Sequence, residues 1–88
     1  MSEMFEVPRV YDVRRCIGWT DRPGYRFKWR SPSFDETLQA LKKAVDYRDR
    51  EWHEKTEEWW VPKDIDLSGI FVNWRGQVEA TELQGILL

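Results

Sequence analysis

The segment RDREWHEKTEEWWVP, residues Arg48 to Pro62, decides our interpretation of the fold. It contains two short runs of alternating polar and apolar residues joined by a polar tip, a pattern typical of a β-hairpin. Three of the chain's six tryptophans lie in it. Because aromatic side chains bury more apolar area than others, we expect the core to form around this hairpin.

Successive side chains of a strand point to opposite faces of a sheet, which sorts the hairpin residues into two sets. We expect one face to carry Trp52, Trp59 and Val61 and the other to carry Glu51, Glu58 and Trp60. In this arrangement Trp60 is the ring that we expect to be least buried.

The preceding segment predicts a hairpin followed by a helix. A turn at Asp21–Gly24 joins strands that run from about Val10 to Trp29, since proline and glycine favour turn geometry. In the second strand Tyr25, Phe27 and Trp29 alternate with Arg26, Lys28 and Arg30. Ser33 and Glu36 then match a capping box, and the helix that it begins carries an apolar stripe of Phe34, Leu38, Leu41 and Val45.

The remaining sequence completes the expected fold. Residues 70–83 read as a last hairpin around Arg75-Gly76, after a loop. We therefore predict one α+β domain over residues 1–88, with one amphipathic helix packed on a curved antiparallel sheet of four to six strands. A short sheet of this kind leaves an exposed edge strand, through which a homodimer could form.

Composition limits the class of protein. With 41% hydrophobic and 15% aromatic residues, the chain has enough apolar area to fold. The net charge is only −2, but residues 21–33 carry +3 and residues 51–66 carry −4, which indicates a polarised surface. The chain has a single cysteine, Cys16, which cannot form an internal disulfide. It also has no signal-like start and no apolar run of about 20 residues. These features favour a cytoplasmic protein outside the membrane.

The order of these elements resembles the HARP domain, a small module of annealing helicases with related segments in bacterial and phage proteins. The resemblance covers about residues 25–62 and depends on FKWRSP (27–32), FDETLQALK (34–42), REW (50–52) and KTEEWWVP (55–62). It implies a non-catalytic α+β fold that binds DNA, especially branched or single-stranded DNA. The family often has a basic residue where this chain has Glu57.

The candidate binding residues are cations beside an indole. Arg26, Lys28 and Arg30 would contact phosphates while a base stacks on Trp60, because aromatic rings interleaved with arginine suit single strands. In the alternative interpretation these cations pair across the sheet with Glu51 and Glu58. Two further candidates, Arg48 and Arg50, are flanked by acidic residues with which they could pair instead.

Catalytic and metal sites find little support in the sequence. His53 with Glu54 and Glu57 matches no metal-ligand spacing, and Cys16 with His53 lacks a third orienting group. Asp64–Gly69 begins like a calcium loop, but Arg75 stands where that loop needs a glutamate. We therefore predict no enzyme activity, no cofactor and no metal.

Two functions stay open at this point. The first is a non-catalytic module that binds nucleic acid, single-stranded or branched DNA above all. The second is a small protein, similar to phage or mobile-element proteins, that docks on a host protein through its acidic segment 51–66 and its aromatic residues.

Overall fold

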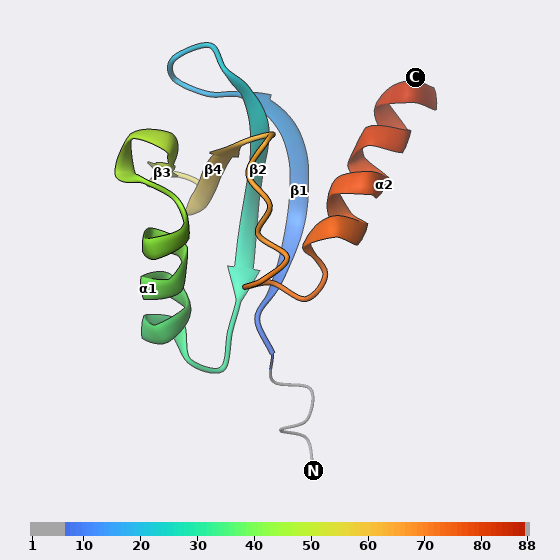
Figure 1. Cartoon of the computed structure of the whole chain (residues 1–88). Coiled ribbons are helices and arrows are strands. Elements are labelled where there is room, and N and C mark those ends of the chain that lie inside the picture. Colours follow the sequence, from blue (N-terminus) through green and yellow to red (C-terminus); the bar gives the residue numbers. More distant parts are fainter. Residues whose placement is uncertain (1–6, 88) are drawn as a thin grey trace.

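The computed structural model describes residues 7–87, which form one sheet with two helices (Figure 1). Strands β1 (Arg9–Ile17), β2 (Pro23–Arg30), β3 (Glu51–His53) and β4 (Glu58–Pro62) pair in the order β1-β2-β4-β3, all antiparallel. The helices are α1 (Phe34–Ala44) and α2 (Trp74–Leu87), and η2 (Tyr47–Asp49) is a 3₁₀ turn between α1 and β3. The predicted α+β class and antiparallel sheet of four to six strands are confirmed, with four strands observed, and α2 is a helix in addition to the one predicted.

The core lies on one face of the sheet, beneath the two helices and a long loop. In Figure 1, the loop from 63 to 73 crosses in front of β2, between α1 and α2. The ring of Phe27 is fully buried there, with edge-on contacts to Phe71 and Trp74 at centroid distances of 5.9 and 5.1 Å. Leu41 and Val45 of the α1 region complete this cluster, so the predicted contact of the helix with the Phe27 face is correct.

The predicted hairpin over residues 70–83 is wrong. Leu67, Phe71 and Trp74 are buried and Val78 is half-buried, a spacing of four, three and four residues that belongs to helical geometry. Hydrogen bonds from Phe71 N to Leu67 O and from Trp74 N to Phe71 O wind this stretch into turns before α2 begins. The apparent alternation of apolar residues was misleading, since Val72 points into solvent.

The hairpin of β1 and β2 is confirmed, with Val10 directly opposite Trp29, but its turn lies earlier than expected. The amide of Asp21 donates to the Gly18 carbonyl at 3.0 Å, and Asp21 itself adopts a left-handed conformation at φ 65°. Gly24 is a residue of β2 instead. A Cβ at that position would lie 2.2 Å from the Val61 carbonyl oxygen, so glycine is required there for close packing.

The start of α1 differs from the predicted capping box. The Ser33 side chain forms no capping hydrogen bond, and the hydroxyl of Ser31 instead accepts from the Ser33 amide at 3.1 Å. Phe34, expected in the buried stripe, is 59% exposed and stacks on Trp29 with centroids 4.8 Å apart and planes 14° apart. The buried side of α1 consists of Thr37 and Leu41.

Residues from the C-terminal part of the chain cover the outer edge of β1. The Asn73 side chain accepts from Val10 N at 2.9 Å and donates to Val10 O at 2.8 Å, so it replaces a neighbouring strand. The Thr81 hydroxyl donates to the Val13 carbonyl, and Val72 N donates to Pro8 O. These bonds satisfy backbone groups that an edge strand would otherwise expose.

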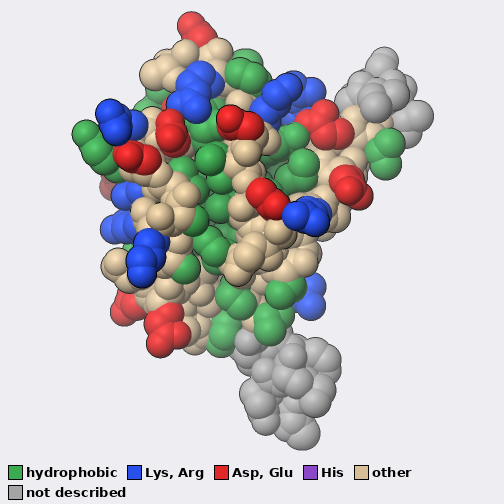
Figure 2. All heavy atoms as spheres, viewed as in Figure 1, with side chains coloured by type: hydrophobic (Ala, Val, Ile, Leu, Met, Phe, Trp, Pro, Cys, Tyr) green, Lys and Arg blue, Asp and Glu red, His purple; other side chains and the backbone are tan. Residues whose placement is uncertain are grey.

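The surface over the helices carries charges of both signs. Figure 2 shows lysine, arginine, aspartate and glutamate side chains intermixed on this side, with hydrophobic side chains between α1 and α2. Within residues 7–87, neither helix has the length and apolar character needed to cross a bilayer.

Candidate functional site

The sheet face opposite the helices carries most of the candidate residues, and we call it the cationic face. The strand registers place Arg9, Tyr11, Arg14, Arg26, Lys28 and Arg30 on it from β1 and β2, with Glu51, His53, Glu58 and Trp60 from β3 and β4. The predicted sharing of one face by Arg26, Lys28, Arg30 and Trp60 is therefore correct. Five cations stand here against two carboxylates.

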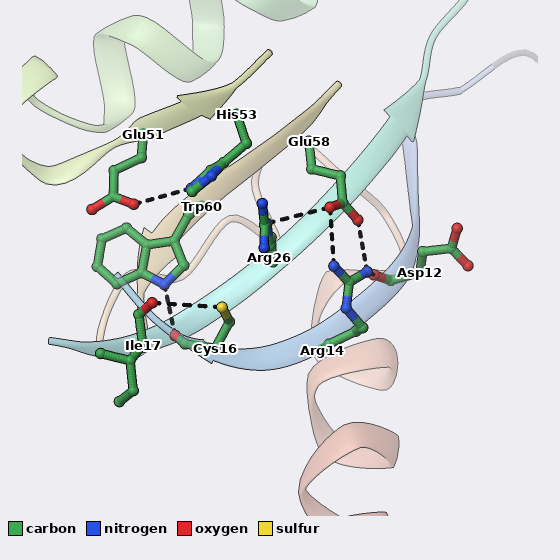
Figure 3. A network of polar contacts seen from close by, with 9 residues as sticks. All are labelled: Asp12, Arg14, Cys16, Ile17, Arg26, Glu51, His53, Glu58 and Trp60. Carbon is green, nitrogen blue, oxygen red and sulfur yellow. Dashed lines mark hydrogen bonds and ion pairs between the residues drawn. The ribbon is translucent and has the colours of Figure 1, made fainter. Parts of the chain in front are cut away.

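The expectation that Trp60 is exposed is wrong, because its side chain is only 1% exposed. The end of the β1–β2 hairpin folds over the indole, whose N–H donates to the Cys16 carbonyl at 2.8 Å (Figure 3). Two glycines make room for the ring, since a Cβ at Gly18 or Gly24 would lie 2.7 or 2.5 Å from indole carbons. Trp60 therefore forms a second small core and has no surface on which a base could stack.

Glu58 holds two of the five arginine and lysine side chains of this face. Its carboxylate accepts from both terminal nitrogens of Arg14 at 2.6 and 3.0 Å, and the Nε of Arg26 lies 3.3 Å away (Figure 3). The glutamate is 3% exposed, and the hydrogen bonds from Arg14, which outweigh the effect of burial, lower its pKa to about 2. Arg26 therefore belongs to an internal ion pair, as in the alternative interpretation of the sequence.

The second carboxylate, Glu51, is also fully engaged. One oxygen accepts from the Trp19 amide at 2.7 Å, and the other lies 3.1 Å from His53 Nε2. The imidazole in turn contacts the Trp19 ring at a centroid distance of 4.8 Å. This arrangement fixes the loop between β1 and β2 against β3 and leaves Glu51 unable to neutralise cations elsewhere on the face.

Arg48 and Arg50 lie apart from this face and have local roles. Arg48, in η2, pairs with Asp46 at 3.4 Å. The Nη1 of Arg50 donates to the carbonyls of Val45 and Lys42, which are left without amide partners at the end of α1. The structure therefore does not bring these two candidates together with Arg26, Lys28 and Arg30.

Three cations of the face remain, and with Tyr11 they form what we call the cationic strip: Arg9, Lys28, Arg30 and Tyr11. Arg9 lies directly opposite Arg30, and Tyr11 directly opposite Lys28. Arg30 stacks over the Tyr11 ring at 5.1 Å. Within residues 7–87, no carboxylate lies within ion-pairing distance of these three cations.

The geometry of the sheet explains why Lys28 pairs with no carboxylate among residues 7–87. Pairing of β2 with β4 ends at Phe27 opposite Trp59, so one further step along this register reaches Lys28 and Glu58. The Glu58 carboxylate is already bound by two guanidinium groups and lies buried beside them. Glu58 therefore neutralises Arg14 and Arg26, and no carboxylate of the described chain neutralises the cations of the strip.

A groove lies next to the strip, where β1 begins and β2 ends. It has a volume of about 850 Å³, and its walls include Arg9, Tyr11, Arg30, Ser31, Phe34 and Asn73. Sequence reasoning missed Arg9, Tyr11 and Phe34 as site residues. The first two follow only from the strand register, while Phe34 matched a buried helical stripe and gave no signal of its exposure.

Searches for relatives add no assignment. No protein-family model, curated protein or solved structure matches the chain. The part of the chain described here also contains no group of three histidine, cysteine, aspartate or glutamate side chains placed to hold a metal ion. The site must therefore be interpreted from its own chemistry.

Proposed function

We propose that this chain is a non-catalytic cytoplasmic module that binds single-stranded or branched DNA through the cationic strip. The observation that carries the proposal is the pair Arg9 and Arg30, directly opposite each other on neighbouring strands. Like charges in such a pair repel one another and destabilise the sheet. A phosphate bound between them would remove this repulsion, which is a physical reason for the arrangement.

The aromatic residues at the strip favour single strands over a regular duplex. The rings of Tyr11 and Phe34 are both partly open to solvent beside the arginines. Unpaired bases can stack on such rings, which contributes about 1–3 kcal/mol per base, whereas the bases of a duplex are already stacked. The resemblance to HARP domains implies the same class of ligand and supports the proposal.

A titration of fluorescently labelled single strands tests this function. We expect binding at about 50 mM salt that weakens with a log–log slope near −2, because three phosphate contacts on a single strand contribute about −0.7 each. The variant Arg9→Gln/Lys28→Gln/Arg30→Gln should lose most of the affinity. Trp60→Phe should keep it, because the indole lies beneath the surface.

The matched control removes the same charge from elsewhere on the molecule. Lys42, Lys43 and Arg48 are exposed outside the strip, and their triple glutamine variant should bind almost as well as the original chain. An equal loss of affinity in both triple variants would show unspecific attraction to charge. No binding of single-stranded or forked DNA at low salt would remove the proposal.

A protein partner is the second candidate, favoured by exposed rings around β3. Trp52 in β3 is exposed, Trp19 is 66% exposed beside His53, and Tyr47 is exposed in the adjoining η2. Exposed aromatic residues commonly anchor protein interfaces. A nuclease-treated pull-down that loses its partner with Trp19→Ser/Tyr47→Ser/Trp52→Ser, but keeps it with the strip variant, would favour this function of a phage-like or mobile-element protein.

A further inference from the structure

The groove beside the cationic strip has the size and polarity of a nucleotide site. Its volume of about 850 Å³ lies within the range of about 300–1,000 Å³ typical of small-molecule pockets. Among the residues that the structure describes, no aspartate or glutamate lines it, while the cross-strand partners Arg9 and Arg30 both do. The described part of this lining therefore attracts anions.

The two arginines match an anion of more than one negative charge. A phosphodiester in the middle of a strand carries a single charge, whereas a phosphate monoester carries about −1.5 to −2 near neutral pH. Each guanidinium presents a planar fork of donors that suits phosphate oxygens. Because Arg9 and Arg30 are cross-strand partners on one face of the sheet, their side chains start close enough together to reach the same phosphate.

The groove also offers an aromatic platform. Phe34 stacks nearly parallel on Trp29, with planes 14° apart, yet is itself 59% exposed. One face of the Phe34 ring therefore contacts Trp29, and its exposed surface lines the groove. A nucleobase placed there would extend an existing stack without reordering either ring.

We infer that this groove binds a nucleotide bearing a phosphate monoester, with the phosphate between Arg9 and Arg30 and the base on Phe34. The inference deepens the proposed function and rests on it: the strip contacts the chain of a single strand, and the groove receives its phosphorylated end. A free mononucleotide has the same chemistry and would occupy the same groove.

The test compares otherwise identical short single strands with hydroxyl ends, a 5′-phosphate or a 3′-phosphate. We expect one phosphorylated end to bind about tenfold more tightly than hydroxyl ends, as two added charge-assisted hydrogen bonds allow. Arg30→Lys keeps the charge but loses the planar fork, so this variant should bind phosphorylated and hydroxyl-ended strands equally. A free nucleoside monophosphate should compete for the phosphorylated end.

Phe34→Leu tests whether a base stacks on this ring. Tyr47→Leu is the matched control, because it removes an exposed ring that lies outside the groove. We expect about a tenfold loss for phosphorylated strands with the first variant and none with the second. Unchanged urea midpoints would show that both variants fold. If hydroxyl-ended strands bind, but neither an end phosphate nor Phe34→Leu changes the affinity, the groove inference is refuted and the proposed function stands. If no strand binds, the proposed function is refuted.

Discussion

Glu58 is the residue whose replacement should reveal most about how the cationic face is held together. Glu58→Gln keeps the shape of the side chain but removes the charge that binds Arg14 and Arg26. The carboxyl is almost fully buried, so the two guanidinium groups would then face a neutral amide in place of their counter-ion. We expect a clear loss of stability at neutral pH.

The pKa of Glu58 sets the size of this loss. Arg14, the main cause, lowers that pKa from 4.5 to about 2. At about 1.36 kcal/mol per pKa unit, this shift corresponds to about 3 kcal/mol. Arg14 is half-exposed, and screening by water brings the expected cost of Glu58→Gln to about 2–3 kcal/mol.

The direction of the pH dependence follows from the same shift. A carboxyl with a lowered folded-state pKa stabilises the protein above its unfolded pKa of 4.5, and this contribution disappears as the pH falls through about 2. The difference in unfolding free energy between the original chain and Glu58→Gln should therefore be largest at neutral pH. At about pH 3 it should have decreased to roughly 1 kcal/mol.

Urea unfolding followed by tryptophan fluorescence measures this difference at each pH. Glu54→Gln is the matched control, because Glu54 is exposed at the tip of the same hairpin and should change stability by less than about 0.5 kcal/mol. An equal cost of Glu58→Gln at pH 7 and pH 3 would refute the assignment of the stabilisation to the charge of Glu58.

Three further outcomes test the packing described above. Gly24→Ala should lower the unfolding free energy by about 3 kcal/mol in a thermal or urea melt, because its Cβ would clash with the Val61 carbonyl and the Trp60 indole. Gly69→Ala is the control and should be neutral, since its Cβ would have no neighbour within 4 Å. Asn73→Ala should cost about 2 kcal/mol and speed amide exchange at Val10, whose backbone it binds; unchanged exchange would contradict this role. Burial and the Glu82 hydrogen bond raise the pKa of Tyr25 to about 12, so the neutral phenol stabilises the protein below pH 10 and this contribution is lost as the pH rises towards 12. Tyr25→Phe should remove that alkaline loss.

Local patterns were enough to predict the four strands of the sheet, but they also predicted a hairpin where α2 lies, and they did not show what covers the sheet. The alternation of Tyr25, Phe27 and Trp29 gave the correct core face, since strand geometry alone decides it. The burial of Trp60 depends on Gly18 and Gly24, which are distant in sequence and admit the β1–β2 hairpin over the indole. The position of a residue in a strand predicts which face of the sheet its side chain lies on. Its solvent exposure depends on tertiary packing.

The candidate site was predicted in part for a similar reason. Lys28 and Arg30 follow from the sequence because they alternate with core residues of the same strand. Arg9 became a site residue only through its register opposite Arg30, a pairing over 21 positions that no local pattern specifies. The ion pairs of Arg14 and Arg26 with Glu58 likewise join three strands, so the sequence alone left open which cations would be neutralised.

The covered outer edge of β1 has a consequence for self-association. On that side Asn73 occupies the amide and carbonyl of Val10 and Thr81 occupies the carbonyl of Val13, whereas β3 ends the sheet on the other side. Filament growth by strand addition needs two open edges per subunit, and this sheet offers one. Copies that joined through β3 would therefore close into a two-fold pair, and the covered edge of β1 would oppose further strand addition.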